Sequence, residues 1–354
     1  MPTEITSGSI KKGIRLFFLL SFVGLMALFY FTLTRESLSA LKQIQFLYLL
    51  LALVLSMADW LLGGWRIYVL SGVLPVRLGY RSSLRSSLAN LCVAAITPSQ
   101  TGGGPAQIFI LNRDGLSMPQ AITLAIVTFT TTLIFMIFVA LLLSIVGVER
   151  LAGIEFQSFF QYGVIGFLSV FVTFAMLLLR PNLLGRLARG GVRLISLVAR
   201  RPYHERADVR RFVREAEACH DGFVLYWRKG KLAFLKAVGI TCWLFLNKFS
   251  IAWVVLKGLG LEAMFRQVIL IQVLITLITY FGPSPGSSGI AELVSAALMA
   301  KIVPRSLLPI YTVLWRFLTT YFGVAVGGVV LLNYLGRTPR RGPAVKPQST
   351  QRKT

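Results

Sequence analysis

Acidic residues and cysteines are scarce in this sequence, and each scarcity excludes a class of protein. Asp and Glu together number 13 of 354 residues, against 37 Lys and Arg, and charged residues make up 14% of the chain. A soluble globular domain carries about a quarter charged residues, so the low fraction argues against one. The three cysteines lack metal-ligand spacing, and free thiols are expected rather than a disulfide framework.

Catalytic and nucleotide-binding patterns are also missing. The chain has no nucleophile elbow, no HExxH pattern and no CxxC pair. The glycine-rich TGGGP at 101–105 lacks the Lys-Ser/Thr of a P-loop and lies inside an apolar segment. The two histidines, His204 and His220, lie in a basic stretch where a metal site is not expected. We therefore expect no metal, no cofactor and no enzymatic activity.

Apolar residues dominate instead, at 55% of the chain, with a mean hydropathy of +0.72. A span across roughly 30 Å of hydrocarbon needs about 20 apolar residues. Six segments are long enough: 14–34, 44–65, 119–147, 159–180, 232–257 and 306–335. The first could be a signal peptide, but its apolar run is long, it has no small-residue cleavage site and more spans follow, so a retained helix is expected. The sequence thus predicts an all-α fold, a polytopic transmembrane helical bundle.

Two further apolar segments are interrupted by Pro and Gly. The segment from about 84 to 111 contains TPSQTGGGP, and that from about 267 to 302 contains FGPSPGSSG. Lipid-exposed helices do not tolerate such clusters, so each segment is predicted to be a re-entrant hairpin of two helices around an unwound turn. An ordinary short helix pair with a purely structural role remains the alternative.

The basic residues, which give a net charge of +24, gather in 66–85, in 180–231 and after residue 336. They lie between apolar spans, so nucleic acid is not an expected partner. Basic loops favour the cytoplasmic side, which predicts both termini in the cytoplasm of a bacterial inner membrane. The first hairpin then opens to the inside and the second to the outside.

The order of elements repeats. Residues 14–147 and 159–335 each contain two spans, a broken hairpin and a span, so a single membrane-embedded domain, 1–335, is predicted to be an inverted repeat. Interrupted segments at matching places indicate a transporter site. Alternating Leu and Arg at 182–217 predict a basic interfacial helix, for anchoring or for collecting anionic lipid. Residues 336–354 are predicted to be a disordered basic tail.

Four ionisable residues fall at membrane depth, where such side chains usually mark a pathway or an ion pair. They are Asp59, Lys248, Glu292 and Arg316. Lys248 lies near mid-span and needs a counter-charge, for which Glu292 is the expected partner; a pathway and a structural salt bridge are equally open. For Asp59 and Arg316, a solvated or snorkelling charge near an interface is as plausible.

The glycines of the broken turns are expected to leave backbone N–H groups free where helices begin, near Ala106 and before Glu292. Helix N-termini with free amides favour an anionic group such as phosphate. Together with Lys248 and Arg316 they predict a cavity for a phospholipid or polyprenyl-phosphate headgroup. The predicted substrate-binding residues are Asn90, Thr97, Pro98, Gly102, Gly103, Gly104, Gln107, Lys248, Pro283, Gly286, Gly289, Glu292 and Arg316.

Three motifs in this order resemble the lysylphosphatidylglycerol synthase transmembrane-region family, whose members are flippase-like membrane proteins. They are Thr97-Pro98 followed by Gly102-Gly103; Pro283, Pro285-Gly286, Gly289 and Glu292; and Trp315-Arg316-Phe317 with Tyr321 and Gly327. The chain departs from the family at Gly104, where many members carry Glu, and at 126–133, which has threonines but no charged pair. Bifunctional members append a soluble aminoacyl-transferase domain, which is not found here.

The resemblance therefore implies a lipid translocase rather than a synthase. Its partners would be anionic or aminoacylated membrane phospholipids or polyprenyl-phosphate lipids, with Glu292 as counter-ion or proton carrier. The alternative is a non-transporting subunit that presents lipid to a separate lipid-modifying enzyme. A membrane-embedded transferase would need a paired carboxylate site, and only Asp59 and Glu292 are available at depth. Substrate, direction, coupling ion and a homo-oligomer remain open.

Overall fold

The computed structural model describes residues 7–32, 44–146, 218–280 and 282–336, together with a few positions between 161 and 176. Within these residues the chain is helical and has no strand, only an isolated bridge between Pro98 and Pro285. The all-α membrane fold is thus confirmed. Half of the predicted span 159–180, the interfacial helix 182–217 and the tail beyond residue 336 lie outside the described residues.

Long helices form most of the structure. In chain order, the helices are α1 (Ser7–Thr32), α3 (Phe46–Ser71), α4 (Tyr80–Ala95), α5 (Gly103–Arg113), α6 (Met118–Val146), α11 (Lys231–Gly258), α12 (Phe265–Tyr280), α13 (Ile290–Met299), α14 (Leu308–Arg316), the π-helical η2 (Phe317–Tyr321) and α15 (Phe322–Leu335). Among the described residues, four stretches are long and apolar enough to cross a membrane: 46–71, 118–145, 231–258 and 308–335.

The boundary of the second span was predicted wrongly. The sequence places its end at residue 65 because Arg66 was assigned to a loop, whereas α3 continues to Ser71. Arg66 lies inside the helix, and its guanidinium donates to Thr132 at 2.9 Å and to Thr241 at 3.3 Å. Hydroxyl groups on α6 and α11 therefore allow a guanidinium at a depth where hydropathy alone predicts solvent.

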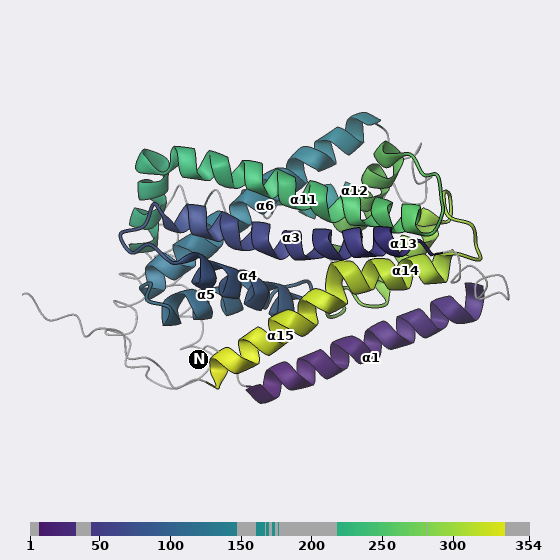
Figure 1. Cartoon of the computed structure of the whole chain (residues 1–354). Helices are drawn as coiled ribbons and strands as arrows, with labels where there is room; N and C mark the ends of the chain where they lie inside the picture. Colours follow the sequence, from purple (N-terminus) through teal and green to yellow (C-terminus); the bar gives the residue numbers. More distant parts are fainter. Residues whose placement is uncertain are drawn as a thin grey trace, which may run out of the picture.

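The two broken hairpins enter the bundle from opposite ends (Figure 1). The α3 and α11 helices run antiparallel, because the Gln45 N–H before α3 donates to the Gly258 carbonyl at the end of α11, at 2.9 Å. Helices α4 and α5 follow α3 at one end of the bundle, and α12 and α13 follow α11 at the other. The order of long helix, broken hairpin and long helix therefore occurs twice, with opposite directions of entry.

The turns of the two hairpins meet inside the bundle. The Ser99 N–H donates to the Gly282 carbonyl at 3.2 Å, and the Gly286 N–H donates to the Thr97 carbonyl at 3.4 Å. Gly286 has a φ of +55°, and a Cβ there would lie 2.5 Å from the Ala95 carbonyl oxygen. Glycine is therefore required at Gly286, both by its left-handed backbone and by the close approach of the other turn.

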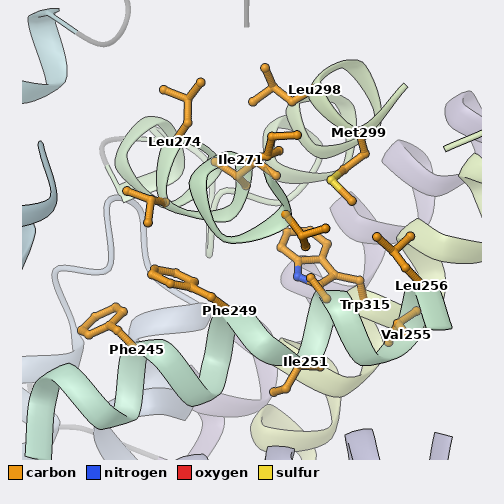
Figure 2. Close-up of a cluster of buried hydrophobic side chains, with 14 of the residues drawn as sticks. Phe245, Phe249, Ile251, Val255, Leu256, Ile271, Leu274, Leu298, Met299 and Trp315 are labelled. Atoms are coloured by element: carbon orange, nitrogen blue, oxygen red, sulfur yellow. The ribbon is translucent and has the colours of Figure 1, made fainter. Parts of the chain in front are cut away.

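A hydrophobic core holds the second hairpin against α11 (Figure 2). Ile271 of α12 and Met299 of α13 belong to one buried cluster with Phe249 and Leu256, which lie on the side of α11 that faces them. On the same helix, Phe245 stacks on Phe135 of α6 with ring centroids 4.6 Å apart. Apolar packing thus holds the second hairpin and α6 against the same long helix.

The last span, 308–335, contains a π-helical segment between two α-helices. Between α14 and α15, η2 has π-helical hydrogen bonding over five residues, and the Leu318 carbonyl within it accepts a hydrogen bond from the Ser56 hydroxyl of α3. Such segments place one extra residue in a helix and are frequent at functional sites. Further along, α15 packs closely on α4, where a Cβ at Gly327 would lie 2.6 Å from the Leu88 carbonyl oxygen.

Gly327→Ala is expected to destabilise the protein, because the new methyl group meets backbone that cannot move aside. Overpacking of this kind costs typically about 1–3 kcal/mol. The matched control is Gly239→Ala on α11, where a Cβ meets nothing within 4 Å and the helix gains about 1 kcal/mol in propensity. Thermal unfolding of the purified protein in detergent measures both. Equal unfolding temperatures for the two variants would contradict the close α4–α15 contact.

Candidate functional site

A cavity of about 670 Å³ lies where the two broken turns meet. It is lined by residues of both hairpins and of the long helices α3, α6, α11 and α14, with η2. Polar residues form much of its wall, including Asn90, Gln107, Gln272 and the threonines Thr128, Thr132, Thr276, Thr279, Thr319 and Thr320. This cavity between the two turns, lined by polar and apolar side chains, is therefore the candidate site.

Arg316 and Glu292 form a buried ion pair at the second turn. Arg316 Nε donates to Glu292 Oε1 at 2.9 Å. The same carboxylate accepts from the Gly289 N–H at 2.7 Å and from the Tyr321 hydroxyl at 2.9 Å. The other guanidinium nitrogens donate to the Thr320 hydroxyl and the Gly286 carbonyl. Glu292 is 0% exposed and Arg316 5%, so both charges are engaged within the protein.

The predicted partner of Lys248 is therefore wrong. Its nearest carboxylate is that of Asp59 on α3, with Nζ 4.0 Å from Oδ2, whereas Glu292 is held by Arg316. Of the two alternatives left open for Asp59 and Arg316, the solvated or snorkelling charge is wrong, since both side chains are buried and both line the cavity. The position of each charged residue in the sequence predicts its depth in the membrane. It does not predict which side of the helix the residue lies on, and that side determines its ion-pair partner.

The expected free amides of the turns are engaged as well. The Gly102 N–H donates to the Thr97 hydroxyl at 2.9 Å and the Gly103 N–H to the Gln100 carbonyl at 3.3 Å. The Gly286 and Gly289 N–H groups are bonded to Thr97 and Glu292, as given above. Moreover, α5 begins at Gly103 rather than near Ala106. Hydrogen bonds within and between the turns thus engage the N–H groups of four of the five glycines; Gly104, which lines the cavity, is not among them.

The predicted site residues fall into two groups. Those that line the cavity are Asn90, Gly103, Gly104, Gln107, Lys248, Gly286 and Arg316. The remainder, Thr97, Pro98, Gly102, Pro283, Gly289 and Glu292, are not among the lining residues; among them, Thr97 and Glu292 hold the turns in shape. At Gly104 a Cβ would meet nothing within 4 Å, so this position leaves space at the wall of the cavity.

Sequence reasoning missed Arg66 as a site residue. Arg66 lines the cavity and bonds to hydroxyl groups only, and its buried Nε has no hydrogen-bond partner among the described residues. The amide of Asn90 donates to Gln107 Oε1 at 2.9 Å, which leaves Gln107 Nε2 unpaired and buried. A signal for Arg66 existed in its seven-residue spacing from Asp59, which places both on one helix face.

The charges at the cavity do not cancel. Arg66, Lys248 and Arg316 are cationic lining residues, and Asp59 is the anionic one. Glu292 behind the wall neutralises Arg316. One positive charge is therefore left over, and the Arg66 guanidinium donates hydrogen bonds to the hydroxyl groups of Thr132 and Thr241. A buried uncompensated cation is costly, and a bound monoanion would balance it. Among the described residues, no cluster of metal-ligating side chains is found.

Comparison with known proteins agrees with the motifs. The family model described as "Lysylphosphatidylglycerol synthase TM region" matches residues 14–327. A "UPF0104 membrane protein" of Archaeoglobus fulgidus is 25% identical over 309 residues, which cover 85% of this chain and 91% of that protein. The similarity therefore extends over both hairpins and the long helices between them.

Glu292→Gln is expected to destabilise the protein strongly, because it leaves the Arg316 charge buried without a counter-ion. Breaking such a pair costs about 3–5 kcal/mol. The control is Glu262→Gln, at an exposed loop position, where a change within about 0.5 kcal/mol is expected. Thermal unfolding in detergent measures both. Adding Arg316→Gln to Glu292→Gln should recover part of the loss; a single variant as stable as the control would contradict a structural ion pair.

Proposed function

Because the chain belongs to the lysylphosphatidylglycerol synthase transmembrane-region family, we propose that it is a lipid translocase that carries an anionic phospholipid headgroup between leaflets. The observation that carries this proposal is the surplus positive charge of the cavity between the two broken hairpins. Arg66 and Lys248 would hold the phosphate, in place of the turn amides expected from the sequence. A phosphodiester bears a single negative charge, which matches the charge left uncompensated.

The size of the cavity supports the same assignment. Small-molecule sites have volumes of about 300–1,000 Å³, and the 670 Å³ here suits a headgroup rather than a whole two-chain lipid. The acyl chains would remain in the bilayer while the headgroup crosses. The polar side chains of Asn90, Gln107 and the threonines would replace its water. Movement of the lipid, rather than chemistry on it, is the activity that we assign.

We infer the membrane and the orientation of the protein in it from the distribution of basic residues. Residues at the end from which α4 and α5 enter include Arg77, Arg81, Arg85 and Arg113. Positive residues favour the cytoplasmic face, so we place that end and both termini in the cytoplasm and the protein in the inner membrane of a bacterium. The first hairpin would then open to the inside and the second to the outside, which suits alternating access.

Reconstitution in liposomes tests the proposal. The purified protein, with a fluorescent phosphatidylglycerol in phosphatidylcholine vesicles, should make inner-leaflet probe accessible to an external quencher faster than empty vesicles do. Arg66→Gln should slow exchange roughly tenfold or more, because a hydrogen bond to a charged group contributes about 1.5–3 kcal/mol. Arg81→Gln, an exposed arginine of α4 that does not line the cavity, is the matched control and should be within roughly twofold of wild type.

The outcome that contradicts the proposal is also defined. Wild type should exceed empty vesicles with at least one of the anionic, aminoacylated and polyprenyl-phosphate lipids. Equal rates with all three would exclude translocation. Binding without exchange would favour a subunit that presents lipid to a separate enzyme.

A further inference from the structure

The ion pair of Asp59 and Lys248 differs from that of Glu292 and Arg316. Lys248 Nζ lies 4.0 Å from Asp59 Oδ2, and its side chain is 35% exposed, whereas that of Asp59 is 9% exposed. The second carboxylate oxygen, Asp59 Oδ1, is buried and has no hydrogen-bond partner among the described residues. Glu292 by contrast receives three donors at 2.9 Å or less. The Asp59 pair is therefore loose, and it borders the cavity.

Among the residues that the structure describes, few charged or titratable groups line the cavity together with Asp59. They are Arg66 on α3, Lys248 on α11, Tyr280 on α12 and Arg316 on α14, and Glu292 holds Arg316. The parts of α4, α5, α6 and η2 that line the cavity contribute amides, hydroxyls and apolar side chains. Of these cations, Lys248 is the one that pairs with the Asp59 carboxylate, and Arg66 lies on the same face of α3 as Asp59.

An anion in the cavity would compete for Lys248. A phosphate bound at Arg66 offers the ammonium group oxygens with a full negative charge, and Lys248 is the more mobile partner of a long ion pair. When Lys248 turns to the phosphate, Asp59 remains buried, with Oδ1 still unpaired. A buried carboxylate that loses its counter-charge favours the protonated form. One proton from bulk water then binds the carboxylate, and no covalent bond in the lipid changes.

We propose that headgroup binding and proton uptake are coupled at Asp59, so that the loaded cavity holds one anionic headgroup and one proton. This inference rests on the proposed function, and it moves the proton-carrying role from Glu292 to Asp59. The loaded and empty cavities then have the same net charge. Transport of a monoanionic lipid with its proton moves no net charge, so a pH gradient drives it and a membrane potential does not.

Calorimetry of ligand binding tests this coupling directly. The full-length protein in detergent is titrated with a short-chain phosphatidylglycerol in buffers of different ionisation enthalpy. Wild type should take up about one proton for each ligand bound, and Kd should rise by up to roughly tenfold per pH unit, since binding that takes up a proton weakens as pH rises. Asp59→Asn should take up no proton and bind with a Kd that does not change with pH.

Two further variants serve as a control and as a replacement for Asp59→Asn. Glu262→Gln, the exposed acid of the α11–α12 loop, should keep the uptake of about one proton. Lys248→Met should abolish uptake, because Asp59 without its cation is protonated before the ligand arrives; it replaces Asp59→Asn if that variant does not fold.

The possible failures can be told apart. Binding by wild type without proton uptake, or unchanged uptake in Asp59→Asn, would overturn the coupling and leave the translocase proposal standing. Absence of binding by wild type, together with no exchange in vesicles, would overturn the proposed function and this inference with it.

Discussion

Hydrogen bonds between the two broken turns are the constraint on which the rest of the structure depends. A helix that stops at membrane depth leaves backbone groups without partners, and hydrocarbon offers none. Here Ser99 and Gly286 donate across the turns, and Glu292 and Thr97 accept from the glycines beside them. Each hairpin therefore needs the other, and a cavity can lie beside them only because the turns supply one another's partners.

The two acidic side chains at depth illustrate two uses of a buried charge. Glu292 is surrounded by donors and fixes the turn to the last span, and its neighbour Arg316 is bonded through all its nitrogens. Asp59 has a single, long ion pair, and its Oδ1 has no hydrogen-bond partner among the described residues. Complete pairing favours rigidity, because any movement loses several bonds at once. Incomplete pairing favours exchange, because little is lost when the partner leaves.

The sequence predicts the helices and their interruptions well, and for a physical reason. Apolar length and Pro/Gly clusters are local properties, so the positions of α6, α11 and both broken turns follow from residues near each other in the chain. Side-chain pairing is not local. Lys248 and Asp59 meet because α3 and α11 pack antiparallel with a particular rotation, and no pattern within either helix specifies that rotation.

The same reasoning explains the other errors at the site. Free turn amides were inferred from glycine content, but whether an N–H is free depends on which carbonyl or hydroxyl the opposite turn brings to it. Arg66 was assigned to a loop because charge usually ends a span. The threonines of α6 and α11 that receive it lie 66 and 175 residues away in sequence. Partners at such separations become visible only in the folded chain.

The π-helical segment η2 has a consequence for how the last span tolerates insertion and deletion. Arg316 precedes it and faces the second turn, while Gly327 follows it and faces α4. An α-helix advances about 100° per residue, so removing the one surplus residue would rotate everything after η2 by that angle relative to Arg316. The glycine would no longer meet Leu88 while the arginine kept its carboxylate. The number of residues between Arg316 and Gly327 therefore matters as much for these two contacts as either residue does.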